Sequence, residues 1–363
     1  MLTVTPTNNV PLSFLIMIMK RSTLLPVALA SSLLFATLGN AQTVATDPVG
    51  FTTHEITPAV NATTPRTTTV SVPFKAIAAF ASSVASVDSA NQLTISGAAF
   101  TAGQYAGATA PHLLKLKTGP NTGRFFLITA NTATQLTVNA AGYTLTSAAP
   151  ANNNQVQVEV GNLIEIIPAN TLSSLFPNPV PFQTGGSAAA ADNVYLYNAG
   201  WEVYFHNGTT WRKTGSFANQ DNTVVYPDDG LFIVRRGIAP LTLTFLGAVP
   251  TTAERTDFPG PGSYFATNRF PVGTTLGGAS GLNLQALPNW QTGASAAVAD
   301  NVYIWDGTGW GVFFHNNTSW RKTGSFANQD SQSIPIGGAL FVVRKSTAPG
   351  TTGTYVQPLP YTP

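Results

Sequence analysis

One block of sequence occurs twice in this chain, at residues 184–240 and 292–349. Both copies contain the strings ADNVY and WRKTGSFANQD at matching positions, and the copies lie about 108 residues apart. A repeated supersecondary unit cannot bury its apolar face alone, so neighbouring copies pack together. The repeat therefore predicts a fold built from two copies of one block.

The patterns inside the copies predict strands rather than helices. Gly and Pro number 32 and 26, and short runs of Val, Ile, Tyr, Phe and Thr alternate with these turn residues. The expected fold is mainly β, with two copies of a β-meander block forming a sandwich- or barrel-like core. Asn207-Gly208 predicts a two-residue hairpin turn, and the Ala-rich segment 76–85 is the best helix candidate. The expected strands are 194–197, 201–206, 211–214 and 231–235, then 302–305, 310–315, 320–323 and 340–344.

Alternation along the strands assigns their faces. Trp201, Val203 and Phe205 share one side of their strand, which we expect to face the core. In strand 194–197, Tyr195 and Tyr197 lie on the side opposite to the aliphatic Val194 and Leu196, so we assign them to a second, aromatic face. That face is covered either by another layer of the protein or by a partner.

The duplicated core is expected over residues 42–82 and 162–363. Residues 83–161 have their own strand and turn pattern and are interpreted as a small inserted β-module. Three extended segments resemble one another, and they are expected to pair within the chain or, alternatively, with a neighbouring copy: 43–51, 241–249 and 354–361.

The N-terminal residues 1–41 have the pattern of a signal peptide. Lys20-Arg21 supplies a basic start, residues 24–38 an apolar run, and cleavage is expected after Ala41. Met19 or Met17 is then the expected true start, and a retained membrane anchor is the competing interpretation. The apolar run is shorter than the roughly 20 residues of a spanning helix. The sequence predicts export to the outer surface, the medium or the periplasm.

Charge and cysteine content exclude some classes of function. The chain has 17 basic and 15 acidic residues, and removing the signal peptide removes two basic residues, Lys20 and Arg21. A neutral chain with 9% charged residues lacks the basic surface that proteins use to bind the phosphates of nucleic acid. Low charge also favours close association between copies. The chain has no cysteine, so no disulfide supports the exported protein.

No catalytic constellation is visible. The four histidines lack metal-ligand spacing, so neither a metal nor a cofactor is expected. Asp192 and Asp300, before matched strands, are interpreted as turn caps. Four basic pairs at strand ends are interpreted as protection of sheet edges, with binding of an anionic polysaccharide as the alternative: Arg212-Lys213, Arg235-Arg236, Arg321-Lys322 and Arg344-Lys345. The acidic candidates for glycosidase chemistry are scattered: Glu202, Asp228, Asp229 and Asp257. We therefore expect that the protein is not an enzyme.

The loops 216–221 and 325–330 are the strongest candidates for ligand binding. An aromatic ring beside amide and carboxylate groups suits the faces and hydroxyls of a sugar. The alternative interpretation is that the loop side chains bond to backbone and only bridge strands. The candidate residues are Trp211, Phe217, Asn219, Gln220 and Asp221, with Trp320, Phe326, Asn328, Gln329 and Asp330 in the second copy.

Several strings resemble a known family. They are TDPVGF at 46–51, GRFFLITANTATQLTV at 123–138, ADNVYLYN at 191–198 and WRKTGS in both copies. The chain is similar to a family of exported β-rich proteins, of no established activity, that occurs as paralogues in Verrucomicrobia-like bacteria. The resemblance implies export and a shared β architecture, and it implies no catalytic residue or cofactor.

The leading hypothesis is an exported, non-enzymatic structural or interaction protein of the cell surface or extracellular matrix. It would act by self-association or through other surface proteins, because the aromatic sheet is duplicated and catalytic chemistry is missing. The alternative is a carbohydrate-binding module that takes a polysaccharide at the two loops. Neither hypothesis includes nucleic acid as a partner or a membrane span in the mature form.

Overall fold

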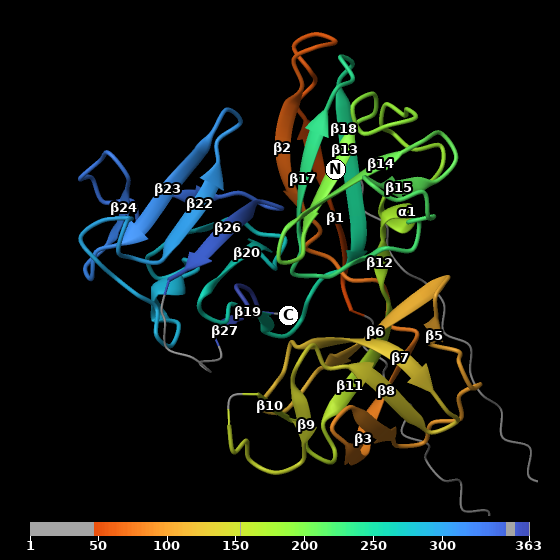
Figure 1. The fold of residues 1–363 in the computed structure, drawn as a ribbon. Helices are drawn as coiled ribbons and strands as arrows, with labels where there is room; N and C mark the ends of the chain where they lie inside the picture. Colours follow the sequence, from red (N-terminus) through yellow and green to blue (C-terminus); the bar gives the residue numbers. More distant parts are fainter. Residues whose placement is uncertain (1–46, 153, 346–352, 363) are drawn as a thin grey trace, which may run out of the picture. The chain divides into compact units, whose positions relative to one another are not determined.

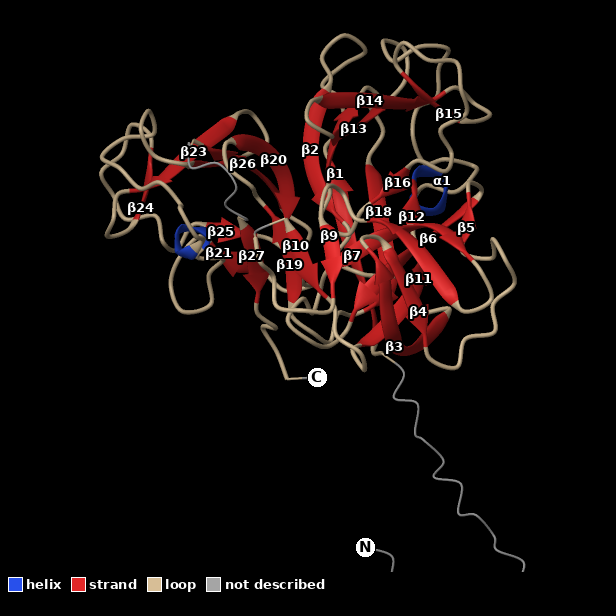
Figure 2. Cartoon of the chain, turned by 60° about the horizontal axis from the view of Figure 1, so that its bottom comes forward, coloured by secondary structure: helices blue, strands red, loops and turns tan. Residues whose placement is uncertain are grey.

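A computed structural model describes residues 47–152, 154–345 and 353–362 (Figure 1). The expected signal peptide, its start and its cleavage point lie outside the described residues. The chain is nearly all β, with 44% strand and 2% helix, as the colouring of Figure 2 shows. Its antiparallel sheets and closed barrel confirm the predicted mainly β, sandwich- or barrel-like fold.

The first copy of the duplicated unit is larger than the repeated sequence block. Its elements are β1 (Val49–Ile56), β2 (Arg66–Ser71), β12 (Asn170–Thr171), α1 (Leu172–Leu175), β13 (Asn193–Tyr197), β14 (Trp201–His206), β15 (Trp211–Lys213), β16 (Val224–Val225), β17 (Gly230–Arg235) and β18 (Leu241–Ala248). Five of them form a sheet in the order β15-β14-β13-β17-β2. Two-stranded pairs β1–β18 and β12–β16 complete the unit.

The second copy repeats this topology strand for strand. Its elements are β19 (Glu254–Asp257), β20 (Gly262–Thr267), β21 (Thr274–Thr275), the 3₁₀ helix η1 (Leu284–Ala286), β22 (Asn301–Trp305), β23 (Trp310–His315), β24 (Trp320–Lys322), β25 (Ser333–Ile334), β26 (Ala339–Arg344) and β27 (Thr354–Gln357). The sheet order is β24-β23-β22-β26-β20, with pairs β19–β27 and β21–β25. The terminal strands β1 and β27 therefore both pair within the chain, which is the first of the two predicted alternatives.

A barrel is inserted between β2 and β12, where the second copy has only residues 268–273. Its segment contains β3 (Phe80–Ser89), β4 (Gln92–Ile95), β5 (Ala106–Gly107), β6 (Ala110–Leu116), β7 (Phe125–Asn131), β8 (Gln135–Asn139), β9 (Thr144–Thr146), β10 (Gln155–Gln157) and β11 (Leu163–Pro168). Six strands close in the order β11-β3-β4-β8-β7-β6, because β6 pairs back to β11 (Figure 1). Leu93, Leu136 and Ile166 belong to its own apolar core.

The predicted faces of β14 are wrong. Val194 lies opposite Tyr204 in the ladder, and both are buried in the core of the first copy. Trp201 lies opposite Tyr197 on the other side and remains 42% exposed. Alternation separated the two sides correctly along each strand. It did not show which side packs inside the copy, because both sides carry large apolar residues.

The aromatic faces of the two sheets pack against each other. Trp201 stacks on Phe341 at 6.0 Å between ring centroids and lies 5.3 Å from Phe265. Phe232 stacks on Trp310 at 5.8 Å. A β-carbon on Gly230 would come within 2.6 Å of the Phe265 ring, which shows how closely the sheets approach. The layer that covers each aromatic face is therefore the other copy, within one chain.

Two local predictions are also wrong. The Ala-rich segment expected to be helical contains the start of β3, because pairing with β4 and β11 overrides a weak helix propensity. The Asn207-Gly208 turn belongs to a four-residue loop instead of a two-residue hairpin. Only Gly208 of that pair has a positive φ (100°), and the Asn207 side chain accepts hydrogen bonds from the amides of Thr209 and Thr210.

Buried ion pairs connect the barrel to the duplicated core. Lys115 of β6 contacts Glu254 of β19, and both side chains are almost fully buried. Arg124, just before β7, bonds Asp257 with both terminal nitrogens, at 2.5 and 3.1 Å. Such pairs are costly to break because a lone buried charge remains. A chain with few charges thus concentrates several of them where these two parts meet.

Candidate functional site

The predicted tryptophans of the binding loops are buried. Trp211 packs at 5.7 Å from the Phe176 ring, and Trp320 at 5.9 Å from Trp290. The Trp320 indole N–H donates to Gln285 at 3.1 Å. Both rings are core residues of their copies and present no face to a ligand.

The amide and carboxylate side chains of the loops hold the loops together. Asp221 accepts a hydrogen bond from the Trp211 amide at 2.8 Å, and its own amide donates to the Asn219 side chain at 2.7 Å. The Gln220 backbone N–H donates to the Trp211 carbonyl at 2.9 Å. The second copy has the same bonds, made by Asn328, Gln329 and Asp330. These polar groups therefore shape the turn, as the alternative interpretation expected.

The phenylalanines of the same loops point into solvent. Phe217 is 96% exposed and Phe326 is 97% exposed. Each lies two residues after a glycine with positive φ, Gly215 at 82° and Gly324 at 81°, a conformation that favours glycine. We call these two side chains the phenylalanine tips. The two loops have the same sequence and the same internal hydrogen bonds, so each phenylalanine tip extends from the same kind of turn.

A cavity of about 490 Å³ adjoins the first tip. Ser187, Asn207, Arg212 and Lys213 line it together with Phe217. Hydroxyl, amide and cationic groups thus lie beside an exposed aromatic ring. The predicted loop residues do not include Asn207 or Arg212, although both belong to the repeated block.

The repeated histidines lie against the buried tryptophans. The rings of His206 and Trp211 are 5.6 Å apart, as are those of His315 and Trp320. Burial lowers the pKa of both histidines, which keeps them neutral near pH 7. Over the described ranges, no group of three or more His, Asp or Glu side chains is arranged to hold a metal ion.

The matched aspartates do more than cap turns. Asp192 forms a buried ion pair with Arg235, and Asp300 pairs with Arg344 at 2.9 Å in the second copy. Arg235 and Arg344 end β17 and β26, which are interior strands of their sheets. Their predicted role in protecting sheet edges is therefore wrong. Each pair fastens the end of an interior strand to the segment before β13 or β22.

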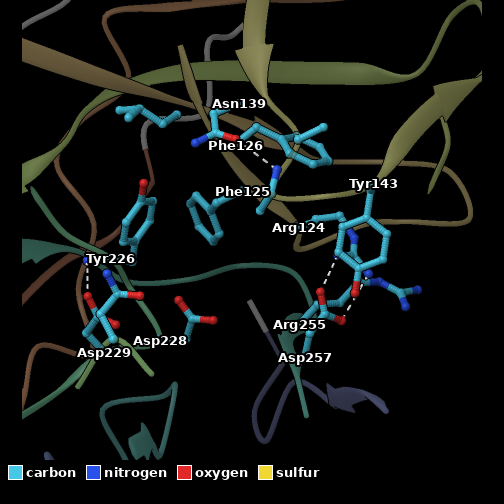
Figure 3. A pocket seen from close by; sticks show the side chains of 14 residues that line it. Arg124, Phe125, Phe126, Asn139, Tyr143, Tyr226, Asp228, Asp229, Arg255 and Asp257 are labelled. Carbon is cyan, nitrogen blue, oxygen red and sulfur yellow. Dashed lines mark hydrogen bonds and ion pairs between the residues drawn. The ribbon is translucent and has the colours of Figure 1, made fainter. Parts of the chain in front are cut away.

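Three acidic residues that are scattered in sequence line one cavity of about 400 Å³ (Figure 3). Asp228 and Asp229 come from the turn before β17, and Asp257 comes from β19 in the second copy. Burial raises the pKa of Asp228, and burial together with the adjacent Asp228 charge raises that of Asp229 to about 8. No pattern along the chain indicates this grouping, because only the packing of the two copies brings the segments together.

The acidic cavity does not present a pair of free carboxylates. Asp257 is held by the two Arg124 nitrogens and by the Thr354 hydroxyl at 2.7 Å. Asp229 accepts a hydrogen bond from the Tyr226 amide at 2.8 Å. Glycoside hydrolysis requires one carboxyl to donate a proton while a second acts as base or nucleophile. The geometry gives structural partners to two of these acids, Asp229 and Asp257.

Comparison with known proteins returns no relative. No family model, no curated protein and no solved structure matches this chain. Within the described part of the chain, every helix is too short and insufficiently apolar to cross a membrane.

Proposed function

We propose that this protein is an exported, non-enzymatic interaction protein that contacts a partner at the cell surface or in the extracellular matrix. The observation that carries the proposal is the pair of phenylalanine tips, Phe217 and Phe326, held almost fully exposed by identical loops. Burying a Phe side chain contributes about 1.5–3 kcal/mol, which is available to binding only while the ring is exposed. Partner binding would use that free energy at two matched points.

The internal packing of the aromatic faces favours the tips as the contact surface. Phe232 and Trp310 stack on each other between the two sheets, and Trp201 stacks on Phe341 there while 42% of it stays exposed. Their packing leaves much less aromatic surface for a second molecule than the tips offer. The terminal strands β1 and β27 are paired within the chain. A partner surface that engages both tips would gain from the linkage of the two contacts.

Binding of the labelled, mature protein to washed cells of the producing strain tests this proposal. The double variant Phe217→Ala/Phe326→Ala should weaken binding by at least tenfold, since it removes both rings and disturbs no buried contact. The matched control is Phe51→Ala, which removes a 72% exposed ring from β1. It should bind like the wild type.

Two results would contradict the proposal. Unchanged binding by the double variant would exclude the tips as the contact. An equal loss in Phe51→Ala would show that exposed rings act without regard to their loop. Cell fractionation with an antibody to the mature chain tests the location, and an exclusively cytoplasmic protein would contradict export.

Carbohydrate binding is the second candidate, favoured by the cavity beside Phe217. The ring offers a stacking surface, and Asn207 and Arg212 offer hydrogen-bond donors to hydroxyl groups. A glycan array compares the wild type with Phe217→Ala and Arg212→Ala. Binding that is lost in both variants supports a sugar ligand, and an array without any binding contradicts it.

A further inference from the structure

Two lysines and two acidic residues form a compact cluster next to the barrel. The Lys75 amine lies 2.5 Å from a carboxylate oxygen of Asp47 and 2.5 Å from one of Glu165. Lys117 contacts the other Glu165 oxygen at 2.8 Å. The Lys75 side chain is only 2% exposed, and Glu165 is also buried. One buried amine therefore lies between two carboxyl groups.

We propose that Lys75 and Asp47 become joined by an intramolecular isopeptide bond, with Glu165 as the proton relay. The bond would tie the segment before β1 to the segment after β2. It would be a covalent cross-link in an exported chain that has no cysteine and hence no disulfide.

The condensation balances without any further reactant. Glu165 takes a proton from the Lys75 ammonium, and the neutral amine attacks the carboxyl carbon of Asp47. The new bond joins the lysine nitrogen to that carbon, and the bond from the carbon to one Asp47 oxygen breaks. That oxygen leaves as water with two protons of the original ammonium: the one that Glu165 took first and the one that the nitrogen gives up as the amide forms. The third proton stays on the amide nitrogen, and Glu165 is a carboxylate again. One positive and one negative charge disappear together, and Glu165 keeps its ion pair with Lys117.

Proximity and burial both favour the amide. Groups held in reacting position reach effective concentrations of about 10⁵–10⁸ M, far above those of free amines and carboxylates in water. Burial of the Lys75 side chain also limits the access of water to the product. The second buried pair, Lys115 with Glu254, lacks a relay, because Arg269 holds the other Glu254 oxygen at 2.9 Å. We expect no cross-link there.

Mass spectrometry of the purified, denatured mature chain tests the proposal. The wild type should be lighter than its sequence by one water. Trypsin should leave residues 67–115 uncut at Lys75 and joined to the peptide that contains Asp47. Lys75→Arg retains a positive charge but should restore the full mass. Asp47→Asn should still cross-link, losing ammonia in place of water.

Two further variants test whether Glu165 acts as the proton relay or whether any change in this cluster prevents the reaction. Glu165→Gln should give the full, unreacted mass, whereas Lys117→Arg keeps the charge beside Glu165 and should retain the water loss. A wild type of full mass with ordinary cleavage at Lys75 would overturn the proposal. A water loss that persists in Lys75→Arg would overturn it as well, since the water would then come from another site.

Discussion

Removing the charge of Asp300 tests the repeated buried ion pair. Asp300 and Arg344 have no exposed side-chain surface, and the guanidinium Nε donates to the carboxylate at 2.9 Å. The carboxylate also accepts the amides of Gln291 at 2.9 Å and Lys345 at 2.6 Å. The substitution Asp300→Asn keeps the shape of the side chain, removes its charge and replaces one acceptor oxygen by an NH2 donor.

The expected loss in the free energy of unfolding comes from the buried Arg344 charge that is left without its partner. Arg344 would keep its hydrogen bonds to the carbonyls of Phe258, Pro288 and Asn289 but would lose its only buried counter-charge in the described part of the chain. Removing one partner of a buried pair costs about 3–5 kcal/mol. The partly exposed pair Glu202 with Lys213, 2.8 Å apart, serves as the control. Glu202→Gln should cost about 0–1 kcal/mol.

Urea unfolding of the mature protein, followed by tryptophan fluorescence, measures both changes. Trp290 is a local reporter, because the Arg344 guanidinium lies 5.4 Å from its ring centre. Equal stabilities of Asp300→Asn and Glu202→Gln would refute the argument, since burial would then add nothing to the value of the pair.

Three further predictions use the same unfolding measurement. Trp211→Ala should lower the free energy of unfolding by about 3–5 kcal/mol, because it removes a buried aromatic side chain. Phe217→Ala should change it by no more than about 0.5 kcal/mol, because that side chain is exposed. Similar losses in the two variants would contradict the burial of Trp211 and the exposure of Phe217. Gly230→Ala should cost about 1–3 kcal/mol, because its new β-carbon meets the Phe265 ring; no loss would show that the sheets are less closely packed. Asp229 has a raised pKa, so the folded protein binds more protons than the unfolded chain between about pH 4 and 8, and stability falls as pH rises through this range. Asp229→Asn should make that fall shallower, and an unchanged slope would contradict the raised pKa.

The sequence predicted the strands of the repeats well because their signals are local. The strands 201–206 and 310–315 have the predicted limits, since aromatic and β-branched runs end at turn residues. The extra residue of the second copy lies in the loop between β22 and β23, as the alignment of the two blocks indicates. Strand limits and the mainly β class both depend on neighbouring residues.

The remaining features depend on contacts between distant segments. The choice of inner face for Trp201 and Tyr204 is decided by the second copy, which no pattern within the strand reveals. The exposure of Phe217 against the burial of Trp211 is likewise set by tertiary packing, although the two residues share one repeated string. The acidic cavity and the cluster around Lys75 require the fold to unite separate segments.

Hydroxyl-radical footprinting read out by mass spectrometry tests the central claim most directly, because it compares rings of one residue type. Phe217 and Phe326 should be oxidised much faster than Phe265, which is buried between the sheets. Washed cell surfaces should then protect the two tips and leave Phe51 unchanged. Similar oxidation rates at Phe217 and Phe265, or protection confined to rings other than the tips, would contradict a chain that covers its own aromatic faces and binds through its loops.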